Sequence, residues 1–552
     1  MKSGSVGDLW WKNAVIYCLD VETFHDSDAD GVGDFRGLID RLDYLAGLGV
    51  TCLWLMPFYP SEQHDDGYDI TDYFAVDPRL GDLGSFTEFV RAADAHGLKV
   101  VVDLVVNHTS DQHPWFQESR SSPDSPRRNY YVWRDEPPDD WETTIFFPGE
   151  QDTNWTFDEQ AGQYYLHHFY PHQPDLHVQE PKVRGEIHEI LGFWIQQGIA
   201  GFRMDAVPYV VDGHGNLGEQ TIAPHALLQD LRSFLQRRKG DSILLGETNL
   251  PPDEAADYLR SDDELQLAFN FHLNQHLFLG LARQDPGPIR TALADLPPIP
   301  EAAQWANFLK NHDELTLDQL SPSEREEVFE AFGPEPGMQL FGRGIRRRVP
   351  TMLGGDERRI RLAYSLMFSL PGTPVLFYGE EIGMGENLDV EGRLAVRTPM
   401  QWLPAEHGGF SCEPDQQFIR PMPTGEREPQ QVNVGDQQQD EGSMLNWMHR
   451  LIRRRRETPE IGMGETAECD TGDPSILALR IAWDDRTVLV LHNFSDRECT
   501  ADISEALSEA VVERRDIWGD RRYEPEDGAS VRLSAYGYRW LRLIQRGQET
   551  LL

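Results

Sequence analysis

Acidic, histidine and arginine side chains stand at the ends of several apolar segments that are typical of buried strands. They are Asp103, Asn107, His108, Arg203, Asp205, Glu247, His312 and Asp313. If the strands form a parallel barrel, their carboxyl ends meet on one face and these side chains converge. A single charged residue at a strand end often only caps a loop. Burying so many charges costs several kcal/mol unless they are paired or take part in chemistry, so the set predicts a catalytic site.

Two of these carboxylates, Asp205 and Glu247, lie on neighbouring predicted strands and suit the cleavage of a glycosidic bond. A retaining mechanism needs a nucleophile and a protonated acid ~5–5.5 Å apart. Arg203 precedes Asp205 by two positions, so both side chains point to one side of the strand and the guanidinium would keep the aspartate ionised. Glu247 follows an apolar run and fits the protonated acid. Asp313 is expected to bind sugar hydroxyls and strain the ring.

Short apolar runs alternate with longer amphipathic stretches, and this alternation predicts the elements that position those side chains. The runs cover 14–21, 51–58, 99–108, 201–207, 242–248, 265–271, 307–313 and 373–381. Continuous apolar runs are typical of parallel strands that are buried on both faces. Between them lie helical patterns such as 85–97, where Ser85 is the expected N-cap and a glycine ends the helix. Eight strands with intervening helices predict an α/β fold, a (β/α)8 TIM barrel.

Long polar stretches interrupt this pattern and divide the chain into predicted domains. Because loops beyond ~15 residues without structure of their own are uncommon, the stretch after the third strand predicts an inserted domain B at 107–177. Further insertions are expected at about 315–350 and 385–440. The barrel would then comprise 1–106 and 178–457. Short alternating segments predict an antiparallel β-sandwich domain at 458–552.

The composition limits the partners and compartments that suit this chain. Lys and Arg number 50 and Asp and Glu number 93, which gives a net charge of −43. Such an acidic protein would repel nucleic acid and anionic membranes, and no apolar run is long enough to cross a bilayer. The charge fits either a salt-adapted surface or a genome with an acidic bias. The first residues lack the apolar core of a signal peptide, so we expect a cytoplasmic location.

The cysteines and two adjacent histidines do not indicate a transition-metal site. The cysteines are Cys18, Cys52, Cys412, Cys469 and Cys499. They are too few and too scattered for a disulfide framework, so free and mostly buried thiols are expected. His167 and His168 cannot place two ligands on one helical face, and we expect them to be surface or packing residues. No motif indicates an organic cofactor, and a monomer and a homo-oligomer are both compatible with the sequence.

The segment DSDADGVGD at 26–34 has the composition of a site for a hard cation. Its alternating carboxylates Asp26, Asp28, Asp30 and Asp34, with the carbonyl of Val32, suit Ca²⁺ or Mg²⁺. It is not an EF-hand, because the twelfth position is a glycine rather than a glutamate. A solvated acidic turn in an acidic protein is the alternative.

Four segments in the right order carry a family resemblance. DLVVNH, GFRMDAV, LLGETN and FLKNHD resemble the four signature regions of glycoside hydrolase family 13, the α-amylase family, and HQPDL at 172–176 resembles its fifth region. The resemblance implies Asp205 as nucleophile, Glu247 as acid/base and Asp313 as transition-state stabiliser. It also implies residues around the first sugar, namely Tyr68, Asp69, Asp103, His108, Arg203, His312 and Arg397. A pair between Asp69 and Arg397 would close the pocket end and favour an exo-acting enzyme.

Further stretches resemble the members of this family that interconvert maltose and trehalose. Among them are NHTSDQHPWF (107–116), GQYYLHHFYPHQPDL (162–176), KNHDELTLDQL (310–320) and LPGTPVLFYGEEIGMGEN (370–387). The chain departs from the pattern at His177, in GETN and in the loop 210–220. An isomerase and a hydrolase share a covalent glucosyl–Asp205 intermediate, and a closed, dry pocket decides between them. An exo-acting α-glucosidase, a small-sugar transglucosylase and a non-catalytic sugar-binding protein are the alternatives.

The resemblance also bears on structural metal ions. Loops similar to 26–34 occur in α-glucosidases, which supports a cation there. A second Ca²⁺ site is implied, with the side chains of Asn107, Asp175 and Asp212 and the carbonyls of Tyr209 and Val210 as ligands. Asp212 stands where glutamate is usual. Both sites would be structural and remote from the chemistry.

Overall fold

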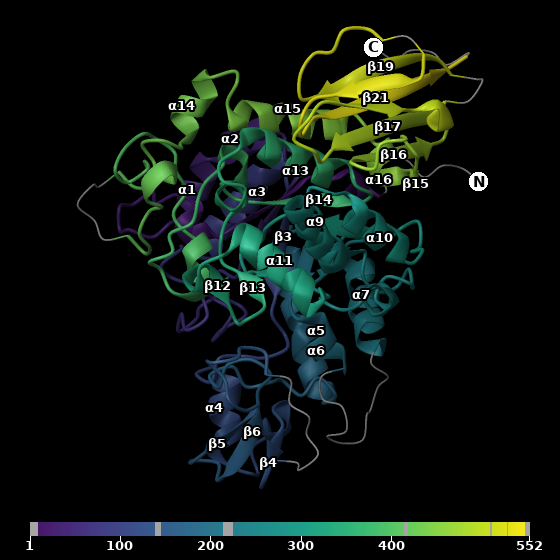
Figure 1. Cartoon of the computed structure of the whole chain (residues 1–552). Coiled ribbons are helices and arrows are strands. Elements are labelled where there is room, and N and C mark those ends of the chain that lie inside the picture. The colour runs from purple at the N-terminus through teal and green to yellow at the C-terminus, as the bar shows by residue number, and fades with distance from the viewer. Residues whose placement is uncertain are drawn as a thin grey trace.

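Eight parallel strands close into a barrel at the centre of the computed structural model, which describes residues 9–137, 145–212, 225–412, 418–507, 511–526 and 528–546 (Figure 1). The strands follow one another around the barrel in the order β1-β14-β10-β9-β8-β7-β3-β2. They are β1 (Ile16–Leu19), β2 (Cys52–Leu55), β3 (Lys99–Leu104), β7 (Gly201–Met204), β8 (Ile243–Gly246), β9 (Leu267–Phe269), β10 (Gln304–Asn307) and β14 (Thr373–Phe377). The predicted (β/α)8 barrel is confirmed.

The helices that cover the barrel bury an apolar stripe. In α3, for example, Phe86, Phe89, Val90 and Ala93 are buried, a spacing of three and four residues that lies on one helical face. The α-helices are α1 (Phe35–Asp40), α2 (Leu42–Leu48), α3 (Leu83–Ala95), α4 (Pro114–Ser121), α5 (Pro181–Gln196), α6 (Val207–Asp212), α7 (Ala226–Arg238), α8 (Pro252–Asp257), α9 (Phe271–Arg283), α10 (Gly287–Asp295), α11 (Pro322–Phe332), α12 (Val349–Met352), α13 (Glu357–Ser369), α14 (Val434–Gln439), α15 (Met444–Arg456) and α16 (Glu460–Met463).

Two local predictions are wrong in their boundaries. The N-cap of α3 is Asp82, whose side chain accepts from the Ser85 backbone N–H while the Ser85 hydroxyl accepts from that of Asp82. Ser85 therefore completes a capping box from inside the helix. The strand expected at 307–313 is Gln304–Asn307. Its apolar continuation, Phe308 and Leu309, is equally buried, so burial does not mark where the strand ends.

Two smaller sheets lie within the predicted insertions. Strands β4 (Trp133–Arg134), β5 (Trp155–Asp158) and β6 (Gln163–Leu166) form an antiparallel sheet in the order β4-β6-β5. Strands β11 (Leu315–Thr316), β12 (Gln339–Leu340) and β13 (Gly344–Ile345) form another, with β13 in the middle. Figure 1 shows the β4–β6 sheet at the end of the molecule opposite the C-terminal strands. The exact domain boundaries stay predictions.

The C-terminal part consists of antiparallel strands that enclose an apolar cluster of their own. Strands β15 (Glu465–Glu468), β16 (Ile476–Trp483), β17 (Arg486–Asn493), β21 (Tyr538–Gln545) and β19 (Val511–Gly519) form one sheet in this order. Strands β18 (Cys499–Asp502) and β20 (Ser530–Leu533) form a second sheet. Leu489 and Leu541 from the first sheet share buried contacts with Val531 from the second, which is the packing of a β-sandwich.

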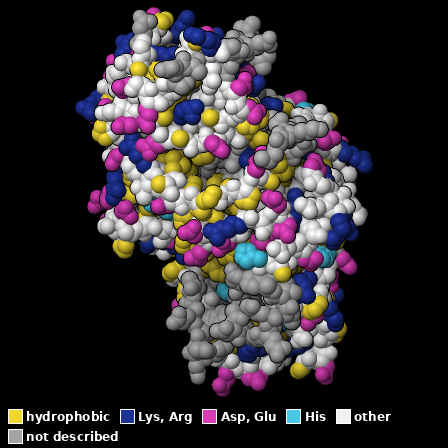
Figure 2. All heavy atoms as spheres, turned by 90° about the vertical axis from the view of Figure 1, so that its right-hand side faces the viewer, with side chains coloured by type: hydrophobic (Ala, Val, Ile, Leu, Met, Phe, Trp, Pro, Cys, Tyr) yellow, Lys and Arg dark blue, Asp and Glu magenta, His cyan; other side chains and the backbone are white. Residues whose placement is uncertain are grey.

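The surface and the cysteines agree with the composition. Figure 2 shows one face on which acidic and basic side chains are interspersed. All five cysteines are free, Cys412 exposed and the other four buried, as predicted. Within the described residues, no helix combines the length and the apolar character needed to cross a membrane.

Candidate active site

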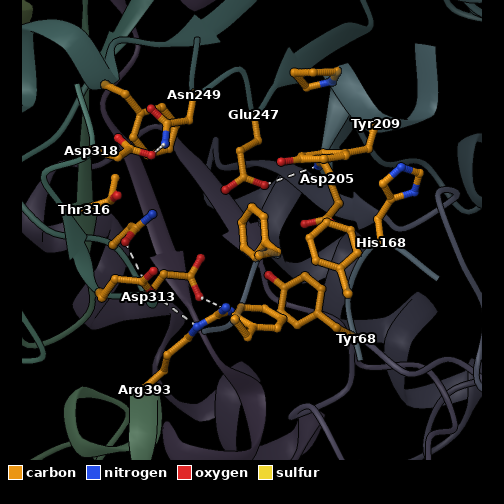
Figure 3. Close-up of a pocket in the computed structure, with 18 of the residues that line it drawn as sticks. Tyr68, His168, Asp205, Tyr209, Glu247, Asn249, Asp313, Thr316, Asp318 and Arg393 are labelled. Carbon is orange, nitrogen blue, oxygen red and sulfur yellow. Dashed lines mark hydrogen bonds and ion pairs between the residues drawn. The ribbon is translucent and has the colours of Figure 1, made fainter. Parts of the chain in front are cut away.

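The carboxyl ends of β3, β7 and β8 and the segment after β10 supply the side chains of the site. The register of β3 against β7 pairs Asp103 with Arg203, so both side chains leave the sheet on the same face. Asp205 directly follows β7, and Glu247 directly follows β8. Asp313 lies farther beyond the end of its strand, and Figure 3 shows it across the pocket from Glu247. The local fold therefore gathers charges that the sequence places far apart.

Arg203 is the electrostatic centre of the site. Its Nη1 donates to Asp103 Oδ1 at 2.6 Å and to Asp205 Oδ1 at 2.7 Å. Its Nη2 donates to Glu247 Oε2 at 2.8 Å. The Trp54 indole N–H donates to the other oxygen of Asp103 at 2.9 Å. One buried guanidinium thus contacts both candidate reacting carboxylates, Asp205 and Glu247, and fixes their positions relative to each other.

The environment separates the protonation states of the two carboxyl groups. Burial raises the pKa of Asp205 to about 6, although Arg203 opposes this shift. Burial raises the pKa of Glu247 to about 7, again against the effect of Arg203 and with help from the charge of Asp205. Near neutral pH more of Asp205 than of Glu247 is therefore ionised. This order suits a nucleophile beside a proton donor.

Asp313 is held ionised on the opposite side of the pocket. Its Oδ1 accepts from Arg393 Nη1 at 2.9 Å and from Arg397 Nη2 at 3.0 Å. His312 Nε2 lies 3.2 Å from the other oxygen. Burial raises the pKa of Asp313, but His312 and the two arginines together hold it well below its usual range. A permanent negative charge therefore faces Asp205 and Glu247 (Figure 3).

Two aromatic rings form the floor beside these carboxylates. The Tyr68 hydroxyl lies 2.7 Å from His312 Nε2, and the two rings are parallel within 6° at 5.6 Å. His108 Nε2 lies 3.2 Å from the Tyr68 carbonyl oxygen. Burial lowers the pKa of His108 to about 4, so its imidazole is neutral near pH 7. Neutral donors and acceptors of this kind suit sugar hydroxyls.

The predicted pair between Asp69 and Arg397 is wrong. Arg397 Nη1 donates to Asp66 Oδ2 at 2.6 Å, and Arg420 contacts the other oxygen of Asp66. Asp69 is fully buried and instead accepts from the Ser61 hydroxyl at 2.7 Å and from two backbone N–H groups of the same turn. Asp69 therefore shapes the turn, while Asp66 presents the carboxylate to the arginines.

A cavity of about 560 Å³ opens above these groups (Figure 3). Six predicted residues line it, namely Tyr68, His108, Asp205, Glu247, His312 and Asp313. Three others, Asp103, Arg203 and Arg397, are buried. Arg203 and Arg397 contact the cavity carboxylates Asp205 and Asp313, and Asp103 accepts from Arg203. The volume accommodates a ligand of disaccharide size and is typical of small-molecule sites.

The cavity has further lining residues that the sequence reasoning missed. They include Asp65, Phe146, Phe147, His168, Tyr209, Asn249, Asp318, Arg343 and Arg393. Asn249 donates to Asp318 Oδ2 at 2.9 Å across the wall. Asn249 lies in GETN, close to Glu247 in the sequence, and Asp318 lies in KNHDELTLDQL, close to Asp313. This closeness to the candidate catalytic residues is the sequence signal that could have identified them. His168 was expected at the surface or in packing, yet it faces the cavity.

The second predicted metal site lies beside this cavity, because His168 and Tyr209 line it, so the prediction that this site is remote from the chemistry is wrong. Asn107 Nδ2 donates to Asp175 Oδ1 at 3.1 Å, and His168 Nδ1 contacts the other carboxylate oxygen. Among the described residues, the buried Oδ1 of Asn107 has no hydrogen-bond partner, as expected of an oxygen that serves as a cation ligand. Tyr209 and Val210 belong to α6. The side chain of Asp212 lies outside the described residues.

The loop 26–34 brings several carboxylates together, and some of them also accept hydrogen bonds from the local backbone. Carboxylate oxygens of Asp26, Asp28 and Asp34 lie within 4.8 Å of one another. Asp26 accepts backbone N–H groups of Ala29 and Gly31, and Asp34 accepts that of Gly37. Three clustered carboxylates are a donor set that hard cations accept.

Comparison with known proteins places the chain among carbohydrate-active enzymes. Residues 18–323 and 343–464 match the family described as alpha amylase, catalytic domain, and residues 486–542 match a sucrose hydrolase-like C-terminal domain. Trehalose synthase/amylase TreS of Mycobacterium tuberculosis is 41% identical over 88% of this chain and 82% of its own length. Trehalose synthase of Thermus thermophilus is 43% identical over 88% of this chain and 50% of its own. A structure of the trehalulose synthase MutB superposes with a TM-score of 0.77 at 26% identity, covering 97% of this chain and 100% of that one.

Proposed function

Because the chain belongs to the α-amylase family, glycoside hydrolase family 13, we propose that it is a retaining enzyme that interconverts maltose and trehalose. The observation that carries the proposal is the contact of one guanidinium, that of Arg203, with both Asp205 and Glu247. The similarity to trehalose synthases over most of the chain supports the choice of substrate. An isomerase is a transglucosylase whose acceptor is the sugar it has just released.

The first step would be attack of an Asp205 carboxylate oxygen on the anomeric carbon of the bound glucosyl unit. The bond to the leaving oxygen breaks, and Glu247 gives that oxygen its proton, so glucose is released and a glucosyl–Asp205 ester forms. The ionised Asp313 faces the ring and stabilises the positive charge that develops on it. Asp205 loses its negative charge in this step and Glu247 gains one, so the net charge in contact with Arg203 stays the same.

The second step decides the product. In the isomerisation, the released glucose turns so that its own C1 hydroxyl attacks the ester, Glu247 takes the proton, and trehalose leaves. In hydrolysis, water takes the place of that hydroxyl, and a second glucose results. The two outcomes differ only in the nucleophile, so the exclusion of water from the cavity sets their ratio.

Carbon or proton NMR of the purified protein with maltose, at low and at high salt, tests the proposal. Trehalose with little glucose supports the isomerase. Glucose alone would contradict it and leave an exo-acting α-glucosidase of the same family. No turnover of maltose in either buffer would also contradict it, and other α-glucosides would then be tested as substrates.

We expect the pH dependence of kcat/KM to be bell-shaped, with an acid limb near pH 6 and an alkaline limb near pH 7. Below the first value Asp205 gains a proton and loses its nucleophilicity. Above the second value Glu247 loses the proton that it must donate. Asp103, whose pKa is also raised to about 6 by burial, contributes to the acid limb through Arg203. Initial rates with maltose, whose leaving group needs the proton, measure both limbs over this range, and a rate that keeps rising well above pH 7 would contradict the role of Glu247.

We also infer that the loop 26–34 binds Ca²⁺ through Asp26, Asp28 and Asp34, with Asp30 and the Val32 carbonyl as further ligands. Asn107 and Asp175 would hold a second Ca²⁺. A bound ion would supply no catalytic chemistry here; it would neutralise the clustered carboxylates and stabilise the fold.

Chelation should therefore lower the melting temperature by a few degrees, because free Ca²⁺ at one hundred times its Kd stabilises the folded state by about 2.7 kcal/mol. Asp28 is the best residue to replace, since it is exposed and accepts the Asp30 backbone N–H only at 3.3 Å, whereas Asp26 and Asp34 accept closer backbone groups of the loop. Asp28→Asn should shrink the shift caused by EDTA, whereas Asp262→Asn, at an exposed acid elsewhere, should not. An equal shift in both variants would show that the loop does not bind the ion.

A further inference from the structure

A short hairpin stands at the wall of the cavity, directly next to the segment that follows Asp313. Its strand β13 pairs with β12 on one side and with β11 on the other. Strand β13 lies very close to the segment that carries Asp313 and Glu314, because a Cβ at Gly344 would lie only 2.5 Å from Glu314 Cγ. The position of the hairpin is therefore tied to the backbone that carries Asp313 and Glu314.

The tip of this hairpin holds a bulky residue in an unfavourable backbone conformation. Phe341 has a φ of +54° and is followed by Gly342 with a φ of +65°. Glycine adopts this region freely, but a phenylalanine does so at a cost. In this conformation the half-buried Phe341 ring packs against Phe147 of the inserted segment, with ring centroids 5.0 Å apart. The strained residue thus makes a contact between two insertions that are distant in sequence.

Two arginines extend this contact over the cavity. The Arg343 guanidinium lies 4.7 Å from the centre of the Phe146 ring. The Arg393 guanidinium lies 4.6 Å from the Phe147 ring centre while its Nη1 donates to Asp313 at 2.9 Å. We call these five residues, Phe146, Phe147, Phe341, Arg343 and Arg393, the aromatic clasp.

The clasp joins three separate segments at one wall of the cavity. Phe146 and Phe147 come from the inserted segment after β3, and Phe341 and Arg343 come from the hairpin. Arg393 belongs to the 3-10 helix Gly392–Val396, which follows β14. Four of its members line the cavity, and Phe341 instead packs behind Phe147. Phe147 is 2% exposed, and its ring also stacks on that of Tyr170, with ring centroids 4.3 Å apart. Phe341 is therefore the part of the clasp that can be changed without altering a residue of the cavity lining.

We propose that the aromatic clasp, held in place by Phe341, excludes water from the cavity while the glucosyl–Asp205 ester exists, and so favours isomerisation over hydrolysis. This inference rests on the function proposed above. Hydrolysis requires a water oxygen to reach the anomeric carbon, give its proton to Glu247 and displace the Asp205 oxygen. Isomerisation uses the C1 hydroxyl of a glucose already inside. If this wall opens, water enters and the released glucose escapes. Both effects favour hydrolysis over isomerisation.

The test compares Phe341→Ala with wild type in the conversion of maltose, followed by NMR. Loss of one aromatic pair should shift the equilibrium between the closed and the open clasp by roughly threefold to tenfold toward the open form. The ratio of glucose to trehalose should therefore rise by the same factor. The kcat/KM for p-nitrophenyl α-glucoside should stay within about twofold of wild type, because it reports only the steps up to the glucosyl–Asp205 ester, which do not involve Phe341.

Three further variants distinguish the loss of the Phe341 ring from a change in backbone strain and from the loss of an exposed aromatic ring elsewhere. Phe341→Tyr keeps the ring and should restore the wild-type ratio. Phe341→Asn removes the ring but suits a positive φ, so it should raise the ratio as Phe341→Ala does. Phe157→Ala removes an aromatic side chain that is 49% exposed on the same insertion and should leave the ratio unchanged.

If Phe341→Ala still forms trehalose and its ratio of glucose to trehalose equals that of wild type, the proposed role of the clasp is overturned. The proposed isomerase function would not be affected by this result. A wild-type protein that makes only glucose would instead contradict the isomerase. The clasp would then be tested with p-nitrophenyl α-glucoside as donor and glucose as acceptor. The share of glucosyl transfer over hydrolysis should fall in Phe341→Ala, and an equal share would overturn the clasp.

Discussion

Asp205→Asn should lower the turnover of maltose by about 10⁴-fold or more, because an amide oxygen does not form the glucosyl ester. The substitution keeps the shape of the side chain and one oxygen that can accept from Arg203 Nη1. The expected loss is therefore chemical rather than structural. Initial rates with maltose and with p-nitrophenyl α-glucoside measure it, since both donors require the same nucleophile.

The control for this variant must exclude unfolding, because Arg203 is buried and would lose a charged partner. Thermal melting reports any change in stability, and Asp262→Asn repeats the chemical change at an exposed position. Asp103 still pairs with Arg203 in the variant, and Glu247 still accepts from it, so a folded protein is expected. Residual activity within about tenfold of wild type in a folded Asp205→Asn protein would exclude Asp205 as the nucleophile.

The sequence was sufficient for the barrel and for the residues at its strand ends. Strands such as β3 and β8 are buried almost throughout, so continuous apolar runs located them, and the polar residues that follow had to converge. The pairing of Asp103 with Arg203 follows from the same logic, because neighbouring parallel strands bring their carboxyl ends together. The fold class and the meeting of the candidate reacting groups at one end of the barrel thus follow from local pattern.

Contacts between loops could not be predicted in this way. Arg397 was expected to bind Asp69, but Asp66 is the carboxylate that also meets Arg420, a residue of a distant loop whose approach no local pattern reveals. Phe341 illustrates the same limit, because nothing in its neighbourhood in the sequence indicates a partner as distant along the chain as Phe147. The features that would set specificity therefore depend on tertiary packing of insertions.

The roles of Glu247 can be separated by choosing donors with different leaving groups. Glu247→Gln cannot donate a proton, so cleavage of maltose should fall by roughly 10²- to 10⁴-fold. Glucosyl fluoride needs no such proton and should still form the ester with Asp205. The alkaline limb near pH 7 should disappear with this donor, because glutamine does not titrate.

The ester should then accumulate in Glu247→Gln, because its breakdown by water or by a sugar hydroxyl needs a base to take the proton. Mass spectrometry of the intact protein would show the added glucosyl unit, and azide, which carries no proton to remove, should release it as glucosyl azide. The amide oxygen of the substituted side chain can still accept the Ala206 backbone N–H that Glu247 accepts at 3.2 Å, so the local structure is expected to persist. If maltose and glucosyl fluoride lost activity equally, with no ester and no azide product, Glu247 would not be the acid/base, and the proton would have to come from another carboxyl group of the cavity, such as Asp65, whose pKa burial raises to about 6.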